Sequence, residues 1–322
     1  MAHIRNSRKS TGRTTTARSP RGTRPAHKAR PNRRTLRRET PSTVGLLADA
    51  YDFEAMTRYR TFAFDDHTAY LRQVEGLLRS FAAQGLHTTV ALFDPEEFTE
   101  FCTATGIDPD TPASRTRFTA EIAAAGTRVP YQGQPIDSLV PELINKAVRQ
   151  ATWDYATLLL ADLGECAECG QDIGRSAFER ASTILTRLIE AAGPGLHHMV
   201  CSVQAQREQL IAVLHAEGRG DAEGRGGEPV RLDETDVAEF VTVLAAGIAQ
   251  HSPGGLVLRT TSADAPDRVH GWRLHEGGLH PLTAGEVFSA YCTDADTGDP
   301  VAPEPGVDYR AGFPFDQPTT DH

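Results

Sequence analysis

The apolar positions from residue 59 onward alternate between strand and helix spacing. The segments YRTFAF (59–64) and HTTVALF (87–93) have the aromatic and β-branched content of short strands. Between them, apolar residues three and four positions apart predict a helix that Asp65 or Asp66 caps and that ends before Gly85. A further helix follows residue 93, so the region predicts an opening strand–helix–strand–helix unit.

Asp94 ends the second predicted strand and is followed by Pro95, Glu96 and Glu97. Aspartate at this position accepts hydrogen bonds from first-turn amides, proline fits the first helical position, and Glu97 completes a capping box. Open α/β sheets also place ligand-binding groups at the carboxyl ends of strands. We interpret Asp94 as a helix cap, with a pocket near it as the alternative.

Helical spacing dominates the middle of the chain. The longest apolar stripe predicts a helix over about 138–163. Ser176 with Glu179 three residues later starts another helix, which the Pro-Gly pair at 194–195 ends. A third helix is predicted over about 203–215.

The last third of the chain combines helices with short strands. A helix is predicted over about 235–249, and the segments LVLRTT, RVHGWRL and GLHPL predict strands that include an antiparallel hairpin. Thr283 with Glu286 predicts a capping box and a final helix. From about residue 294 the sequence is acidic and rich in proline, and we expect it to be largely disordered.

Charge is segregated along the chain. Residues 1–39 hold thirteen Arg or Lys against Glu39 alone, so they carry +12, and the remainder carries −22 within the net charge of −10. This split predicts either a nucleic-acid-binding arm or a tail that lies on its own acidic body. The Arg, Ser, Thr, Gly and Pro content of the tail also predicts disorder.

Composition disfavours several classes of protein. Lysine occurs only at Lys9, Lys28 and Lys146, whereas a phosphate-binding GxxxxGK[ST] loop or a lysine Schiff base needs lysine in a suitable context. No run approaches the roughly 18–20 apolar residues of a membrane-spanning helix, and no apolar stretch follows the basic N-terminus as in a secretory signal. We therefore expect a cytoplasmic location.

Four residues have the spacing of zinc ligands. Cys166 and Cys169 are separated by two residues and followed by a glycine, so both thiolates can reach one metal from a tight turn. His198 and Cys201 repeat the two-residue gap. The pattern CxxC…HxxC predicts a structural Zn²⁺ site of the Cys3His type, with His197 as the alternative to His198.

Twenty-seven residues, which include a predicted helix, lie between Cys169 and His197. A helix of about 17 residues spans roughly 25 Å, so the chain must double back to bring the halves together. A redox-active CxxC and inert buried cysteines are the alternatives. Redox CxxC motifs open a helix directly after a strand, whereas this pair lies between two predicted helices. The HAE sequence at His215 follows the CxxC pair instead of preceding it, which disfavours a deaminase.

The predicted fold class is α+β, mixed and helix-rich, with an N-terminal βαβα unit, central helices around a zinc knuckle and a C-terminal antiparallel hairpin. The predicted segments are a disordered Arg-rich tail (1–43), an α/β body with the zinc site (56–215), a flexible loop (216–231) that could divide two subdomains, an α+β C-terminal part of the body (232–293) and an acidic Pro-rich tail (294–322).

Three functions are compatible with these features. The first is a nucleic-acid-associated or regulatory binding protein that acts through its basic tail. The second is an enzyme of unassigned reaction with a pocket near Asp94 or near His270 and Trp272. His270 and Trp272 share one strand face, where they could line a pocket or serve as amphipathic side chains that cover a sheet. The third is a protein-interaction module. Translation from Met56 would remove the tail and the nucleic-acid argument with it.

The stretch from YRTFAFDDHTAYLRQVEGLL to HHMVCSV resembles uncharacterised hypothetical proteins of high-GC Gram-positive bacteria. The resemblance covers about 56–310 and implies no activity. It implies that the body is a family in its own right, with the basic tail as an addition.

Overall fold

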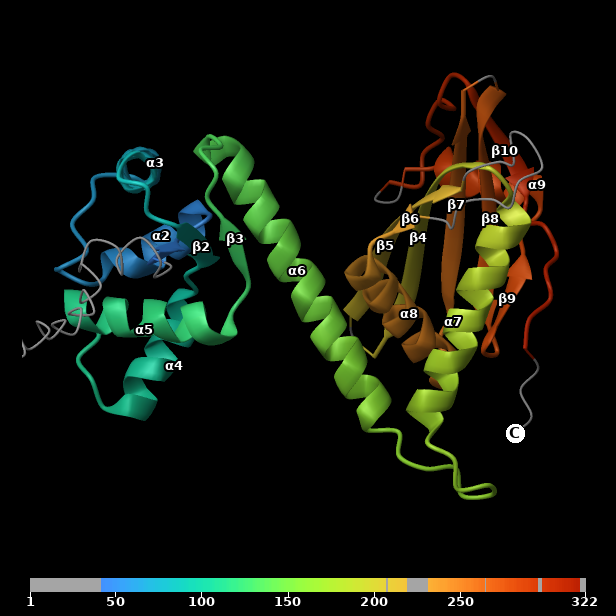
Figure 1. Ribbon diagram of the computed structural model, residues 1–322, viewed down its shortest axis with the longest axis horizontal. Helices are drawn as coiled ribbons and strands as arrows, with labels where there is room; N and C mark the ends of the chain where they lie inside the picture. Colours follow the sequence, from blue (N-terminus) through green and yellow to red (C-terminus); the bar gives the residue numbers. More distant parts are fainter. Residues whose placement is uncertain (1–41, 207, 219–230, 264, 295–296, 319–322) are drawn as a thin grey trace, which may run out of the picture.

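Two units joined by one long helix make up the computed structural model, which describes residues 42–206, 208–218, 231–263, 265–294 and 297–318 (Figure 1). The N-terminal unit contains β1 (Ser42–Leu46), α2 (Ala50–Thr57), α3 (His67–Ala83), β2 (Thr88–Leu92), α4 (Pro95–Thr105), α5 (Pro112–Ala125) and β3 (Arg128–Pro130). The joining helix is α6 (Ile136–Ala161).

A three-stranded sheet in the order β1-β2-β3 lies at the centre of the N-terminal unit, with β1 parallel and β3 antiparallel to β2. Its core is rich in aromatic rings: Phe93, Phe98 and Phe118 contact one another with ring centroids 5.0–5.6 Å apart. Asp66 caps α3 and Asp94 caps α4, as expected. Local capping signals therefore account for the starts of α3 and α4, and aromatic packing closes the core.

The strand predicted over residues 59–64 is wrong, because this segment is an irregular connection between α2 and α3. Local turns and side chains, not a neighbouring strand, satisfy its backbone. The Phe62 N–H donates to the Tyr59 carbonyl at 3.0 Å, the Thr61 N–H donates to Asp110 at 2.9 Å, and Arg115 donates to the Thr61 carbonyl at 3.0 Å. Tyr59 and Phe62 are buried. The apolar alternation thus reflects packing into the core, without strand pairing.

The first strand of the sheet is β1, which includes the last two residues of the predicted tail and precedes Met56. Leu46 is fully buried, Phe53 is buried, and Met56 is only 1% exposed within α2. A chain that started at Met56 would lack β1 and most of α2.

The C-terminal unit is built on a seven-stranded sheet. It contains α7 (Ile173–Ala192), β4 (Gly195–Ala205), β5 (Glu208–Gly218), β6 (Arg231–Leu232), α8 (Glu234–Ala249), β7 (Gly254–Ser262), β8 (Ala265–His275), β9 (Gly278–Pro281), α9 (Ala284–Tyr291) and β10 (Val307–Ala311). The strand order is β10-β8-β7-β4-β5-β6, with β9 paired to β8. All pairs are antiparallel except β10 with β8. The predicted hairpin of RVHGWRL and GLHPL is confirmed as β8 and β9.

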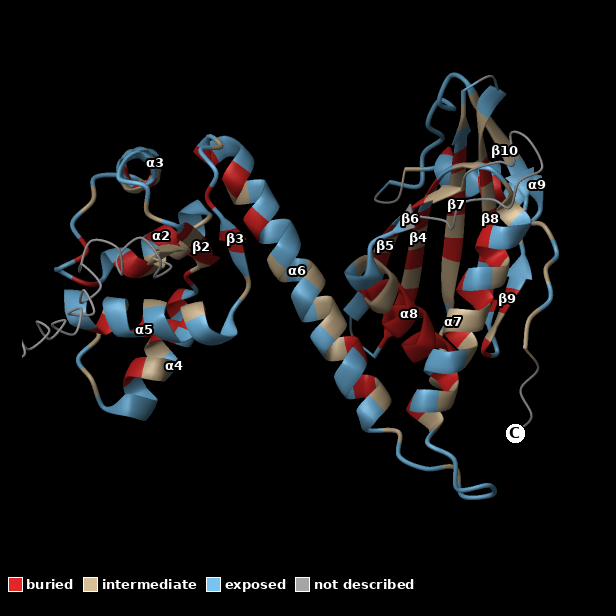
Figure 2. Cartoon of the chain, in the orientation of Figure 1, coloured by how far each residue is buried: buried red, intermediate tan, exposed pale blue. Residues whose placement is uncertain are grey.

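Helices α7 and α8 share one hydrophobic core with this sheet. All residues of α8 from Glu239 to Ile248 are buried, and Figure 2 shows α8 largely in the colour of buried residues. On β8, Trp272 belongs to this core, whereas the neighbouring Gly271 lies next to Val287 of α9. Because successive strand residues face opposite sides, α9 covers the other face of the sheet near β8.

The helix predicted over 203–215 is wrong. β4 and β5 pair antiparallel in register from Gly195–Gly218 to Ala205–Glu208. Buried and less buried residues alternate along β5, which is strand periodicity. Its Leu, Ala, Gln and Glu residues favour helix in isolation, and pairing with β4 overrides that preference.

Three predicted segments extend beyond the described residues. Residues 1–41 of the tail and 219–230 of the loop lie outside them, as do 295–296 and 319–322. β5 and β6, which lie on either side of the loop, belong to one sheet, so the loop does not separate two sheets. The expectation of disorder from residue 294 is wrong for 307–311, because these residues form β10.

Helix α6 contributes side chains to both hydrophobic cores. Ile136, Leu139 and Leu143 belong to the N-terminal core, whereas Ala156 and Leu159 belong to the C-terminal core. The predicted helix over 138–163 is thus confirmed, and the chain changes from one unit to the other within it.

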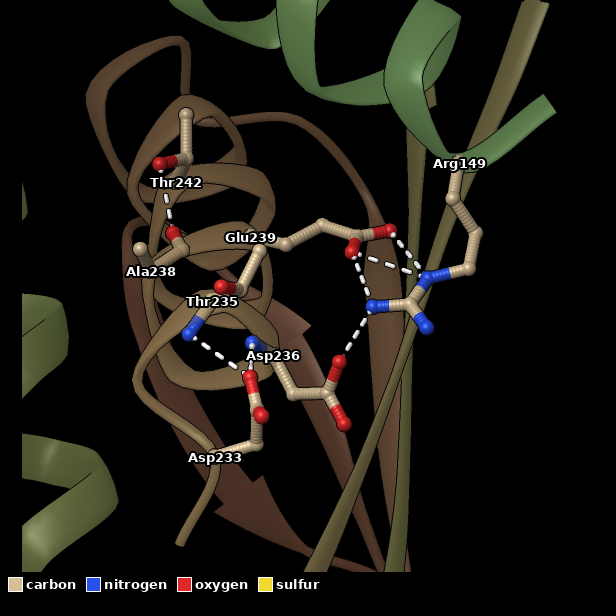
Figure 3. A network of polar contacts seen from close by, with 7 residues as sticks. All are labelled: Arg149, Asp233, Thr235, Asp236, Ala238, Glu239 and Thr242. Atoms are coloured by element: carbon tan, nitrogen blue, oxygen red, sulfur yellow. Dashed lines mark hydrogen bonds and ion pairs between the residues drawn. The ribbon is translucent and has the colours of Figure 1, made fainter. Parts of the chain in front are cut away.

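An ion-pair network fixes the middle of α6 to α8 (Figure 3). The Arg149 Nε donates to the two Glu239 carboxylate oxygens at 2.9 and 3.2 Å, and its Nη2 also contacts Glu239 and Asp236. The Glu239 side chain is 5% exposed. Asp233 caps α8 beside this network. We call Arg149, Asp236 and Glu239 the α6–α8 clamp.

Candidate metal site

The CxxC pair lies in a tight turn between α6 and α7, which we call the CxxC turn (residues 165–172). Glu165 and Asp172 form an antiparallel bridge across its base. The Cys166 N–H donates to the Gln171 carbonyl at 2.8 Å, and the Gly170 N–H donates to the Cys166 carbonyl at 2.8 Å. Gly170 has φ +73°, which a residue with a side chain adopts only with strain. The glycine after the second cysteine is therefore required by the turn itself.

The two thiols of the CxxC turn lie next to each other and beside backbone donors. The pKa of Cys166 is lowered, first by the backbone N–H of Cys169, then by that of Glu168 and by the Cys169 side chain. These donors stabilise a thiolate, the form of cysteine that binds metals. Both cysteines are free of disulfides, and Cys169 is exposed. The turn therefore presents two adjacent thiol ligands at the surface.

A cavity of about 320 Å³ opens beside Cys166, between the CxxC turn, the first half of α7 and the residues at the end of α8. Its lining includes the apolar side chains of Ala177 and Ile248 together with Arg180 and His251. His251 follows α8 with φ +51° and is exposed. The fold thus brings a histidine and Cys166 to one cavity, although the two residues are distant in the sequence.

The histidines predicted as ligands have other surroundings. The buried His197 ring is hydrogen-bonded at both nitrogens, to the Gly193 carbonyl at 2.9 Å and to the Thr260 hydroxyl at 3.0 Å. Because the carbonyl only accepts, Nε2 carries the proton and Nδ1 accepts from Thr260. Burial is the main cause that lowers the pKa of His197. His198 stacks on His215 of the neighbouring strand, with ring centroids 4.6 Å apart.

Cys201 lies in the hydrophobic core of the C-terminal unit and is 1% exposed. Burial raises the pKa of its thiol to about 12, so the thiol stays protonated. On β4, residues three apart face opposite sides of the sheet and lie roughly 10 Å apart, so His198 and Cys201 cannot hold one ion. His197 and Cys201 share a face but are separated by roughly 13 Å along the strand.

Within the described residues, no group of three or more His, Cys, Asp or Glu side chains is arranged to hold a metal ion. The four predicted ligands are not brought together in one chain. The structure places Cys166 and Cys169 in the turn before α7, whereas the histidines and Cys201 lie on β4, which follows the other end of that helix. The zinc knuckle with central helices arranged around it is therefore not part of the fold described here.

The secondary pocket candidates have structural contacts. The Asp94 carboxylate accepts from the N–H groups of Glu96 at 2.7 Å and Glu97 at 3.1 Å. The Trp272 ring is fully buried and donates to the Phe313 carbonyl at 3.1 Å, and His270 donates to the Ala311 carbonyl at 2.8 Å. All three groups are thus held by backbone partners.

Residues 31–134 match the model of a family described as "Domain of unknown function (DUF8829)". This range is 104 of the 322 residues and covers the sheet of the N-terminal unit, from before β1 to just before α6. No curated protein and no solved structure matches the chain. The match starts upstream of Met56 and excludes the CxxC turn, whereas the resemblance noted from the sequence extended over about 56–310. No helix within the described part of the chain is long and apolar enough to cross a membrane.

Proposed function

We propose that the protein is a zinc-dependent protein-interaction module and that the CxxC turn binds the metal. The observation that carries this proposal is the bridged, hydrogen-bonded turn that holds Cys166 and Cys169 two residues apart and free of disulfides, with backbone N–H donors beside the Cys166 sulfur. Such donors offset the negative charge that thiolates bring to a zinc ion. An exposed site that contributes two of the four ligands needs a partner to complete it.

The shape of the turn favours zinc over redox chemistry. Catalytic CxxC pairs have their first cysteine at the N-terminus of a helix, where the helix dipole lowers its pKa. Here Asp172 caps α7, six residues after Cys166, so Cys166 lies outside the helix and within the bridged turn. The donors to its sulfur come from the turn's own backbone, as they do around a tetrahedral thiolate site.

Competition with a chromogenic chelator tests zinc binding by the reduced full-length protein. We expect the wild-type chain to retain Zn²⁺ against the chelator and Cys169→Ser to lose at least a hundredfold in apparent affinity, because one thiolate is removed from the site. Cys292→Ala is the matched control, since Cys292 is buried beside α9 and away from the turn. Equal zinc affinity of the wild type, Cys169→Ser and Cys292→Ala would overturn the proposal.

A further inference from the structure

We infer that a second copy of this chain completes the site, so that two CxxC turns share one zinc ion through four cysteine thiolates. The inference rests on the proposed zinc binding by the CxxC turn and adds the identity of the partner. It also predicts the metal content: one zinc for every two chains.

The distribution of cysteines supports a second copy. The chain has five cysteines, and all of them lie among the described residues. Three of them, Cys102, Cys201 and Cys292, are buried with exposures of 3%, 1% and 6%. Only Cys166 and Cys169 are available to an ion at the surface, so an all-thiolate set of four needs two chains.

The position of the turn makes such an approach sterically open. The CxxC turn extends beyond the ends of α6 and α7, at the margin of the C-terminal unit (Figure 1). Every residue from Glu165 to Asp172 is exposed except Cys166, which is partly exposed. A second turn of the same shape brings two more thiols that its own backbone already orients, so little conformational entropy is lost when the site forms.

Apolar side chains on both flanking helices are exposed near the turn. Leu158, in the last turn of α6, is 61% exposed, and Phe178, in the second turn of α7, is 38% exposed. Most residues of their size in the C-terminal unit are buried. A second copy at the turn gives these side chains a surface to contact.

Electrostatic repulsion opposes the contact but is too weak to prevent it. Asp162, Glu165, Glu168 and Asp172 are all exposed around each turn. Pairs of exposed charges change an equilibrium by at most about fivefold each, and salt screens them. Coordination of zinc by a structural site favours the bound state by roughly ten-million-fold or more. Because salt screens the repulsion between the carboxylates of the two turns, zinc-dependent association should tighten when salt is added.

The test combines molecular mass with metal content on the full-length protein in a reducing buffer. Light scattering coupled to size exclusion should give twice the chain mass with zinc and a single chain mass with EDTA, and elemental analysis of the dimer should give one zinc per two chains. Cobalt substitution should give the spectrum of a tetrahedral site with four sulfur ligands. Cys166→Ser should remain monomeric with zinc, with an unchanged far-UV circular dichroism spectrum.

Charge variants give a second readout. Glu168→Gln keeps the backbone donor of the turn and removes one carboxylate from each copy, so it should tighten the zinc-linked dimer by a few-fold. Glu54→Gln, on the exposed side of α2 in the other unit, is the matched control and should have no effect.

The two proposals fail separately. One zinc per monomeric chain would leave the zinc-binding turn in place and overturn the second copy. A dimer that persists in EDTA and in Cys166→Ser would also overturn it. Failure of the wild-type chain to bind zinc under reducing conditions would remove both proposals.

Discussion

The α6–α8 clamp should make a large contribution to stability, and replacing Arg149 by methionine tests this. Methionine keeps the length of the side chain and removes the charge. Glu239, whose side chain is 5% exposed, would then be left as a buried carboxylate without its Arg149 partner, although Asp236 is 25% exposed and stays close to water.

The magnitude follows from burial. Removing one partner of a fully buried ion pair costs about 3–5 kcal/mol, whereas exposed pairs contribute about 0–1 kcal/mol. The Arg149 side chain is 39% exposed, so the expected loss lies between these limits, at roughly 2–3 kcal/mol. With a urea dependence of about 2–3 kcal/mol/M, the unfolding midpoint should fall by about 1 M.

Urea unfolding of three variants provides the assay. Arg175→Met removes an exposed ion pair with Glu179, in which the side chains are 80% and 66% exposed, and should cost under about 0.5 kcal/mol. The double variant Arg149→Met/Glu239→Met removes both charges and should recover at least half of the loss. If Arg149→Met costs no more than Arg175→Met, the clamp is not an important link between α6 and α8.

Three further predictions concern the pH response, core packing and the first strand. Burial lowers the pKa values of His197, His198 and His270, so the unfolded state binds more protons than the folded state below about pH 6.5. The midpoint of urea unfolding should therefore be lower at pH 5.5 than at pH 7.5. An equal or higher midpoint at pH 5.5 would contradict this prediction. Gly247→Ala should destabilise the protein by about 1–3 kcal/mol in urea, because its Cβ would lie 2.6 Å from Leu274 and 2.8 Å from Val203, whereas Gly76→Ala on α3 meets no atom within 4 Å and should be neutral or stabilising. Deletion of residues 1–55 should abolish cooperative unfolding of the N-terminal unit, because it removes β1 from the sheet; a native-like near-UV spectrum of this variant would refute that role.

Local signals predicted the helices better than the strands. The caps of α3, α4 and α9 and the apolar stripes of α6, α7 and α8 fall within a few residues of the predicted positions, because capping and 3.6-residue periodicity are properties of short segments. β10 was missed because its pairing with β8 joins residues about 40 positions apart, such as Val307 and Asp267, within a Pro-rich and acidic stretch.

The same limit explains the zinc prediction. The spacing of Cys166 and Cys169 indicated a turn with two ligands, and the structure brings these two residues together. HHMVC has a two-residue gap that suits ligands in a turn, but on β4 that gap directs His198 and Cys201 to opposite faces. No short-range pattern indicated that Arg149 would pair with Glu239 or that His251 would share a cavity with Cys166.

Zinc content of two purified variants tests the central claim most directly. Cys166→Ser removes a thiolate of the CxxC turn, and Cys201→Ala removes the buried thiol that the sequence alone suggested as a ligand. Measured by elemental analysis on folded protein from zinc-replete cultures, Cys201→Ala should retain the wild-type zinc content and Cys166→Ser should lose it. Loss of zinc from Cys201→Ala, or full zinc content in Cys166→Ser, would contradict the account.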